Sequence, residues 1–409
     1  MPEQTYDVVI CGASLTGLAL ALALQASSRS GLSIAIIDRE PPPVPLEDLR
    51  AFAISAASVH LLRSIGIWPA VAASAEPVSE IRVTGARLES PVRQTLLSYE
   101  NVTPDGEAAS HILPASVLRA ELAKSFARSG VAIFAGSAPT AIACTPQSIR
   151  IERAASDPIS ARLAVAADGR RSALRDLAGI KTVNWAYPQA AIVNTVSHSE
   201  PHNGVATQHF LEAGPFAILP LTGGHCSSLV WTEDSTEAGR LMQLGDTEFL
   251  AALEQRFGGI LGTVALAGPR ASQPLELHMA RALAGDRLAV IGDAARTVHP
   301  IAGQGLNLGL RDVAALTETI IDSARLGLDI GEPASLNRYQ QWRRFDGVMS
   351  AAAMDGLNRL FSNDNSALRV VRDAGLGLTD RLPGLKRLIV EEAAGLTGTL
   401  PKLLQGELP

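Results

Sequence analysis

The sequence predicts an α/β fold, in which a domain built on a parallel sheet carries an inserted antiparallel sheet and a C-terminal helical tail. Near the N-terminus, two apolar runs at residues 6–11 and 33–37 flank an Ala/Leu-rich segment, which is the pattern of a βαβ unit. Between residues 189 and 277, strand-like runs alternate with turns, which favours an antiparallel sheet. Beyond residue 366, leucines recur at helical spacing.

Composition limits the class of protein. The chain has 409 residues, of which 47% are hydrophobic and 19% charged, as expected of a soluble globular protein large enough for two cores. Its net charge of −6 and the absence of a Lys/Arg run argue against nucleic-acid binding. Cys11, Cys144 and Cys226 form no CxxC pair, so we expect free, buried thiols in the cytoplasm.

Residues 8–28 carry no charge and could be mistaken for a signal peptide or a membrane-spanning helix. Acidic Glu3 and Asp7 precede this stretch without a basic flank, and Gly12 and Gly17 interrupt it. We therefore interpret it as a strand, a turn and a helix of a soluble domain.

The turn between the first strand and the helix predicted at residues 15–25 carries a nucleotide-binding pattern. Gly12 would permit a tight turn and Gly17 close packing, while the helix N-terminus would face a pyrophosphate. Asp38, after the second strand, would hold ribose hydroxyls. Ser14 replaces the usual second glycine and could donate to a phosphate oxygen. The alternative is an α/β unit that binds no nucleotide.

The segment Asp48-Leu49-Arg50-Ala51 follows a proline-rich loop at residues 41–45, and we predict a helical segment from there to Leu62. Arg50 could reach a phosphate or an acidic substrate, although a solvated surface arginine is the alternative. A serine nucleophile is excluded, because the Gly-x-Ser-x-Gly elbow would need glycine where Thr16 stands.

Two further aspartates follow predicted strands. Asp168 comes after the apolar run 163–167 and precedes a short helix ending at Ala178. Asp293 comes after the run 288–291 and precedes a glycine-rich turn and a helix at residues 306–324. Open α/β sheets bind ligands at the carboxyl ends of their strands, where Asp293 could accept hydrogen bonds from a ribose or ribityl hydroxyl. A glycine-rich connection without a ligand is the alternative.

Together these motifs resemble the single-component FAD-dependent aromatic monooxygenases, and specifically the ubiquinone-biosynthesis hydroxylase (2-polyprenylphenol hydroxylase) branch. The matching stretches are Gly12 to Gly17, Asp48-x-Arg50, Asp168-Gly169, Trp185-x-Tyr187-x-Gln189, Gly214-Pro215-Phe216-Ala217-Ile218-Leu219-Pro220, Gly292-Asp293, His299-Pro300-Ile301-Ala302-Gly303-Gln304-Gly305-Leu306-Asn307-Leu308-Gly309 and Ala394-Gly395. They extend through most of the chain.

The resemblance implies a set of cofactor-binding residues. Those that would surround the ADP half of FAD are Gly12, Ser14, Gly17, Asp38, Arg39, Arg50 and Arg119, with Asp168 nearby. Asp293 would hold the ribityl-pyrophosphate region. Those that would cradle the isoalloxazine ring are Pro300, Gly303, Gln304, Gly305, Leu306 and Asn307. Arg296 stands where relatives often carry His or Gln, and no catalytic acid or base stands out.

The resemblance also implies a fold like that of para-hydroxybenzoate hydroxylase. Its Rossmann-like FAD-binding domain would comprise residues 1–72, 100–180 and 275–345. The substrate domain would comprise residues 73–99 and 181–274, and its sheet would cover the flavin. A C-terminal helical region would comprise residues 346–409.

The implied reaction is hydroxylation of a phenol by O₂. NAD(P)H is the expected electron donor, and O₂ would add to the reduced flavin to give a C4a-hydroperoxide that attacks the ring, because no side chain can do this chemistry. A polyprenylated phenol of ubiquinone biosynthesis would be the substrate. A hydroxylase of a soluble phenol and a non-catalytic flavin-binding subunit of a biosynthetic complex remain alternatives.

Two further segments, around His198 and at residues 366–409, could be either structural or functional. His198 and His202 could suggest a metal, but their spacing is not that of a zinc site, so we expect no metal. The tail at 366–409 carries Leu385, Leu388 and Ile389 beside Arg381, Lys386 and Arg387. It could pack on the core, or lie against the inner face of a membrane or a partner of a ubiquinone-biosynthesis complex.

Overall fold

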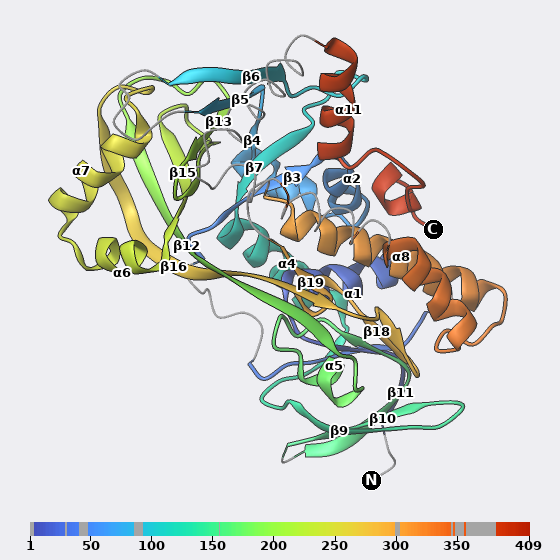
Figure 1. The fold of residues 1–409 in the computed structure, drawn as a ribbon. Coiled ribbons are helices and arrows are strands. Elements are labelled where there is room, and N and C mark those ends of the chain that lie inside the picture. Colours follow the sequence, from blue (N-terminus) through green and yellow to red (C-terminus); the bar gives the residue numbers. More distant parts are fainter. Residues whose placement is uncertain are drawn as a thin grey trace.

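Within the residues that it describes, the computed structural model contains two large sheets, each of eight strands, and a small sheet of three. It describes residues 4–28, 31–40, 48–85, 93–154, 156–298, 303–344, 347, 356 and 382–409. The first large sheet lies with α1, α4 and α8, whereas the second lies beside this unit and carries α6 and α7 on its outer side (Figure 1).

The first sheet is mainly parallel. Its strands are β1 (Gln4–Cys11), β2 (Ile34–Ile37), β8 (Ala132–Phe134), β9 (Pro139–Cys144), β10 (Ile149–Arg153), β11 (Ser156–Ala166), β17 (Ala284–Gly285) and β18 (Leu288–Val290). β18, β11, β1, β2 and β8 are consecutive parallel neighbours, so their carboxyl ends lie along one edge. The strands predicted at residues 6–11, 33–37, 163–167 and 288–291 are confirmed. Their ends agree to within one residue, except that β1 and β11 begin earlier than predicted.

The helices of this domain bury apolar faces on the sheet. They are α1 (Leu15–Ser27), α2 (Ala56–Ser64), α3 (Trp68–Val71), α4 (Ala115–Ser129), α5 (Ala173–Leu177) and α8 (Gly305–Arg325), with 3-10 turns η1 (Ala72–Ser74) and η2 (Gly292–Ala294). Residues 15–24 of α1 are all buried, because its Ala/Leu sequence lies between the sheet, α4 and α8. The predicted helices at residues 15–25 and 306–324 are therefore confirmed.

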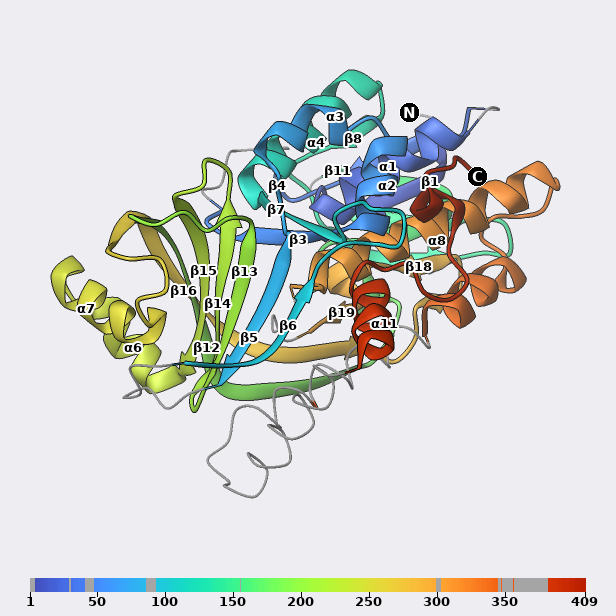
Figure 2. The ribbon, with the colours of Figure 1, turned by 90° about the horizontal axis from the view of Figure 1, so that it is seen from above.

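The second sheet is mainly antiparallel and has one helix-covered face. Its strands are β5 (Glu80–Gly85), β6 (Gln94–Glu100), β12 (Thr182–His198), β13 (Val205–Leu211), β14 (Gly214–Leu221), β15 (Cys226–Asp234), β16 (Val264–Ala280) and β19 (Arg296–Thr297). Helices α6 (Ser235–Gln243) and α7 (Asp246–Phe257) cover its outer face (Figure 2). β12 and β16, each 17 residues long, continue from this sheet beneath the first domain, so the boundary expected between residues 274 and 275 falls inside β16.

The helix predicted directly after Ala51 is wrong in its first residues. Residues 51–55 form β3 (Ala51–Ser55), which pairs with β7 (Ser110–Pro114), and β7 also pairs with β4 (Glu76–Pro77). α2 begins only at Ala56, because the Ser55 side chain accepts a hydrogen bond from the Ser58 N–H and caps the helix.

The described part of the C-terminal tail packs on the first domain. Val390 of α11 (Pro383–Ala393) and Ala394, which follows the helix, are buried against Ala56 and Ala109. The 3-10 turn η4 (Lys402–Gln405) inserts Leu403 and Leu404 into the main core.

The basic residues of the tail have partners within the chain where the structure describes them. Lys386 donates to the Ser98 carbonyl at 2.7 Å, and Arg387 pairs with Glu391 at 2.9 Å. Arg381 and the Leu385 side chain lie outside the described residues. Leu388 is 59% exposed, so this apolar side chain of α11 is in contact with solvent.

The three cysteines are free, but they are not all buried. Cys11 is buried in β1 and Cys226 is partly buried, whereas Cys144 is exposed. The expectation of a buried thiol is wrong for Cys144, because β9 lies at the end of the sheet and pairs on one side with β10.

Gly309 of α8 offers a test of how closely α8 approaches α1. A Cβ at Gly309 would lie 2.6 Å from Thr16 Cγ2 and 3.3 Å from Gly292 Cα, whereas a Cβ at Gly305, in the same helix, would meet nothing within 4 Å. We expect Gly309→Ala to lower the free energy of unfolding of the ligand-free protein by about 1–3 kcal/mol through overpacking. Gly305→Ala should leave it unchanged or raise it by up to about 1 kcal/mol. Urea unfolding measures both, and equal effects would contradict this packing.

Candidate functional site

The carboxyl edge of the first sheet is shaped by glycines. Gly12 has φ +111°, and a Cβ there would lie 2.3 Å from the Ala167 carbonyl oxygen. A Cβ at Gly17 would lie 2.0 Å from the Gly12 carbonyl oxygen. A Cβ at Gly292, at φ +59°, would lie 2.6 Å from Thr16 Oγ1. Side chains are therefore excluded where the ends of β1, β11 and β18 meet the start of α1.

Ser14 has a structural role in this turn. Its hydroxyl donates to the Ala167 carbonyl at 2.9 Å and accepts the Gly17 N–H at 3.1 Å, which caps α1. Ser14 therefore fixes the start of α1 against the end of β11. A contact of its hydroxyl with phosphate stays a prediction.

Asp38 lies beside this turn, as predicted. One of its carboxylate oxygens accepts the Ala13 N–H and the other accepts the Glu40 N–H at 2.9 Å. Each oxygen retains a lone pair that could accept from a ribose hydroxyl. Arg39 is exposed beside it.

Asp168 organises its own loop. It accepts hydrogen bonds from the Ser172 hydroxyl and, at 3.2 Å, from the Leu174 N–H at the start of α5. Burial raises the pKa of Asp168 overall, against the opposing effect of these hydrogen bonds. Its Cα would lie 2.7 Å from a Cβ at Gly12, so this loop contacts the turn before α1.

Asp293 is exposed to solvent, but its carboxyl is also partly desolvated by nearby protein atoms. This desolvation raises the pKa of its carboxyl, against the opposing charges of Arg50 and Arg170. The carboxylate therefore lies at an accessible but recessed position. Such a carboxylate can accept hydrogen bonds from a ligand.

Arg50 and Arg119 converge on Asp48. Arg50 makes a bidentate contact with Asp48 at 2.8 and 2.7 Å, and Arg119 lies 3.4 Å from the same carboxylate. Burial raises the pKa of Asp48, but its hydrogen bonds with these arginines lower it overall. The pKa of Arg50 is raised by its hydrogen bond with Asp48 and by the charges of Asp48 and Asp293. Two cations on one carboxylate leave positive charge available for a phosphate group.

The start of α8 is held to β3 by Asn307. Its amide donates to the Ala53 carbonyl at 2.8 Å and accepts the Ser55 N–H at 3.1 Å. Gly303 has φ +60° and packs near Ala53, and α8 has no side-chain cap after Gln304. The N–H groups of its first turn, including those of Gly305 and Leu306, therefore have no partner within the helix. Pro300 and His299 lie outside the described residues.

A buried charge cluster, which sequence patterns did not predict, lies behind the Asp293 loop. Asp312 of α8 is fully buried and accepts hydrogen bonds from Arg296 at 3.0 Å, Arg343 at 2.9 Å and the Gly292 N–H at 3.1 Å. Arg296, whose role was open, therefore neutralises Asp312, which in turn fixes the turn before Asp293. The partners are 16 to 31 residues apart, so no local pattern reveals them.

These features fit the pyrophosphate and ribose groups of a dinucleotide. The glycine contacts leave the backbone uncovered at the start of α1, where helix N–H groups favour an anion. Asp38 and Asp293 provide acceptors on either side, and Arg50 and Arg119 provide positive charge. The structure brings these predicted residues to one edge of the first sheet. Their contacts with a cofactor stay predictions.

The second sheet turns a half-exposed, mostly apolar face away from α6 and α7. Phe216, Ile218 and Trp231 are buried beneath the two helices. The alternate residues form two cross-strand rows on the other face, where Val193, Val230 and Ala217 are neighbours, as are Thr195, Ser228 and Leu219. Most are only partly buried, and none is charged.

This face meets the first domain near the start of α8. Leu219 and Ile81 belong to one apolar cluster with Ala53, whose carbonyl binds Asn307. Leu277 of β16 packs against the apolar cluster that Val230 also contacts, and against the cluster that contains Leu308 of α8. The sheet therefore lies opposite the glycine-rich start of α8.

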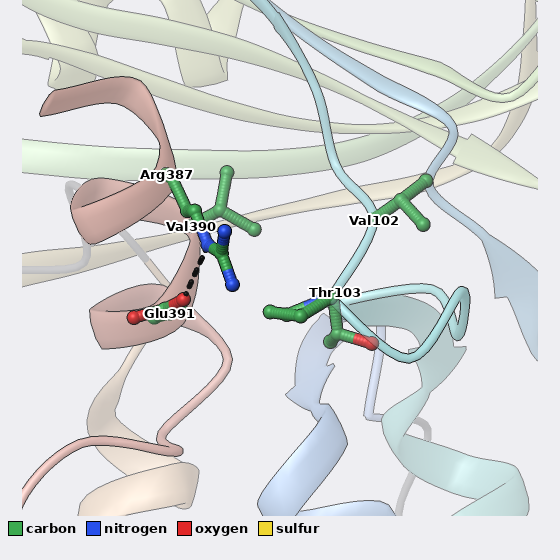
Figure 3. Close-up of a pocket in the computed structure, with 6 residues that line it drawn as sticks. Val102, Thr103, Arg387, Val390 and Glu391 are labelled. Carbon is green, nitrogen blue, oxygen red and sulfur yellow. Dashed lines mark hydrogen bonds and ion pairs between the residues drawn. The ribbon is translucent and has the colours of Figure 1, made fainter. Parts of the chain in front are cut away.

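A small pocket lies elsewhere, between α11 and the loop after β6. Its volume is about 250 Å³, and Val102, Thr103, Val390 and the Arg387–Glu391 ion pair line it (Figure 3). It shares no residue with the predicted cofactor site, so we assign it no role.

We searched the described residues for groups of metal ligands and for helices that could span a membrane. No group of three or more His, Cys, Asp or Glu residues there could hold a metal ion. No single helix of this part of the chain is long and apolar enough to cross a membrane, although the bent pair Ala56–Ser64 and Trp68–Ser74 passes on length and composition.

Comparison with known proteins agrees with the geometry. Residues 5–345 match the family model described as FAD binding domain. The ubiquinone hydroxylase UbiL of Rhodospirillum rubrum is 40% identical over 99% of this chain and 94% of its own length. The 3-demethoxyubiquinol 3-hydroxylase of Escherichia coli is 31% identical over 97% of this chain and 100% of its own length.

A solved structure shares the fold. The p-nitrophenol 4-monooxygenase PnpA of Pseudomonas putida superimposes with a TM-score of 0.79 at 17% identity, covering 97% of this chain and 99% of that chain. This likeness confirms the predicted fold class, an α/β FAD-binding domain with an inserted antiparallel sheet.

Asp293→Asn tests the recessed carboxylate. Losing one charge-assisted hydrogen bond should weaken FAD binding about tenfold to a hundredfold, because such a bond is worth ~1.5–3 kcal/mol. Titration of the FAD-free protein measures the Kd, and the matched control is Asp105→Asn on an exposed loop. Unchanged affinity in Asp293→Asn would remove Asp293 from the site.

Proposed function

Because the chain belongs to the FAD binding domain family and is an FAD-dependent monooxygenase, we propose that it hydroxylates the ring of a polyprenylated phenol in ubiquinone biosynthesis. The relatives named as ubiquinone hydroxylases support the pathway. The half-exposed apolar face of the second sheet, opposite the start of α8, is the observation that carries the substrate class.

FAD fits the carboxyl edge of the first sheet. Gly12, Gly17 and the start of α1 would hold its pyrophosphate, and Asp38 and Asp293 would accept hydrogen bonds from its hydroxyl groups. The start of α8 would lie against its ring system. When bound, FAD would supply the activation of O₂ that no side chain of this chain can supply.

The chain's own residues would orient the reactants and exclude water. The N–H groups of the first turn of α8, which have no partner within the helix, would stabilise negative charge next to them. Asn307 keeps this helix start fixed to β3. The apolar rows on the second sheet would cover the reacting ring and limit access of water.

The same face suits a long apolar substituent better than a small soluble phenol. Val193, Val230 and Leu219 offer partly exposed apolar area without a charged partner for an acidic substrate. Hydroxylation of a soluble phenol remains the alternative. O₂ is the co-substrate, we propose NAD(P)H as electron donor, and the flavin hydroperoxide chemistry expected from the sequence is part of this proposal.

The cellular position is also a proposal. A polyprenylated substrate resides in a membrane, so we propose a cytoplasmic enzyme that works peripherally at the inner face, alone or in a biosynthetic complex. The exposed Leu388 beside Arg387 on α11 is compatible with that position.

The alternative of a non-catalytic subunit loses its basis. It rested on Ser14 and Arg296 as departures from the family pattern. Ser14 caps α1, and Arg296 neutralises buried Asp312. Both residues thus support the site in a way that is compatible with catalysis.

Leu219→Asn tests the apolar face. Because burying a leucine side chain is worth ~1.5–3 kcal/mol, we expect kcat/KM for a polyprenylated phenol to fall about tenfold or more, with FAD binding unchanged. The assay couples NAD(P)H oxidation to mass analysis of the oxygenated product. Thr222→Asn, in the exposed turn after β14, is the matched control.

The comparison of substrates separates the alternatives. Equal kcat/KM for the same phenol with and without its polyprenyl tail would favour the soluble-phenol hydroxylase. NAD(P)H oxidation without oxygen insertion into either phenol would contradict both. Complementation of bacteria lacking individual quinone hydroxylases, with mass analysis of the accumulated intermediates, would identify the ring carbon.

A further inference from the structure

Arg175 ties together the loops that carry two of the strand-end aspartates. This buried arginine in α5 donates from Nη1 to the Arg170 carbonyl and to the Ala294 carbonyl, both at 3.0 Å. Arg170 follows Asp168 by two residues, and Ala294 follows Asp293 directly. A single guanidinium thus spans the loops after β11 and β18.

The same Nη1 atom lies 2.7 Å from Nε2 of His278. Arginine can only donate, so a hydrogen bond between these two nitrogens requires Nε2 of His278 to accept, as it does in the neutral imidazole with its proton on Nδ1. Nη1 has two hydrogens for three acceptors, so one hydrogen is shared between two of them. Nδ1 lies 2.7 Å from the Asn184 side-chain oxygen, which can accept that proton. Both hydrogen bonds require the same tautomer.

His278 and Asn184 lie on the long strands that the two domains share. They are cross-strand partners in β16 and β12, which continue into the second sheet. His278 is buried, and its strand also pairs with β19, just beyond the Asp293 loop. The chain of contacts therefore runs from the two-stranded ribbon of β12 and β16, through His278 and Arg175, to both aspartate loops.

We propose that His278 is a positioning residue for FAD: as a neutral imidazole it anchors Arg175, which keeps the Asp168 and Asp293 loops in their cofactor-binding arrangement. This inference rests on the FAD site of the proposed function. It concerns a residue that is not itself among the cofactor's predicted contacts.

Protonation of His278 would break this arrangement. A cationic imidazole has no acceptor for Arg175 and would face its charge at 2.7 Å, with Arg170 as a second nearby cation. The opposing anions are Glu276 and Asp176, which pairs with Arg175 at 2.8 Å. Burial and the Arg175 charge lower the pKa of His278 from 6.5, against the opposing effects of the Ala294 carbonyl and Glu276. The neutral form therefore prevails near neutral pH. The anchor is lost as the pH falls below 6.5 through the lowered pKa.

The test is the pH dependence of FAD affinity. The Kd of the full-length protein for FAD is measured by flavin fluorescence from pH 8 to pH 5 in the parent, His278→Gln and His198→Gln. We expect the parent Kd to rise about tenfold on the acid side, as expected for a lost charge-assisted contact. His278→Gln, which can accept from Arg175 but does not titrate, should show a flatter profile.

His198→Gln is the matched control, because burial also lowers the pKa of His198, which lies at the other end of β12. It should keep the parent profile. Arg175→Gln should raise the Kd at every pH and abolish the acid-side rise. Thermal unfolding of each FAD-free variant detects general destabilisation.

The outcomes separate the two hypotheses. If His278→Gln keeps the parent profile, or if Arg175→Gln binds FAD normally, the positioning role is refuted while the enzyme assignment stands. If the parent takes up no FAD at any pH, the proposed function fails with it.

Discussion

The site depends on the close approach of four backbone segments around Thr16. Gly12 and Gly17 let the start of α1 lie against the ends of β1 and β11, and Gly292 and Gly309 let the turn after β18 and helix α8 close on the Thr16 side chain. Any Cβ at these positions would meet atoms at 2.0 to 2.6 Å. Because protein interiors are close-packed, these contacts fix the relative positions of Asp38, Asp168 and Asp293 before any ligand binds.

The charges at this edge divide into internal and accessible groups. Asp312 is neutralised inside the protein by Arg296 and Arg343 and holds the Gly292 N–H, and the hydrogen-bonding capacity of Asp168 is largely used within its own loop. Asp293 is left accessible, with only the longer-range charges of Arg50 and Arg170 to oppose its desolvation. The buried ion pairs thus position the loop that carries the accessible Asp293 carboxylate. Buried ion pairs are weak evidence for a gain in stability, so we assign these pairs a positioning role.

The elements that form the nucleotide-binding edge could be predicted from the sequence because they depend on residues close together in the chain. A strand, a glycine turn, a helix and an acid lie within about thirty residues, and strand-end aspartates need only a parallel sheet to come together. β3 was missed because its partner β7 lies some 60 residues away in the sequence, and its run of four apolar residues also suits a helix. The partners of Ser14, Arg296 and His278 were missed for the same reason. The Ser14 hydroxyl donates to Ala167, 153 residues away, and Arg175 meets His278 across 103 residues.

The second sheet has two different faces, so one domain can have its own core and still offer the proposed substrate surface. Period-two alternation places Phe216, Ile218 and Trp231 beneath α6 and α7, where they form a complete core. The opposite face can therefore remain partly exposed and apolar without loss of the domain's own stability. β12 and β16 carry this face into the first domain as continuous strands, so their position relative to the aspartate loops is set by backbone pairing and by one buried imidazole. On the proposed function, a change at that imidazole would affect both the proposed cofactor edge and the proposed substrate face, because the same two strands reach both.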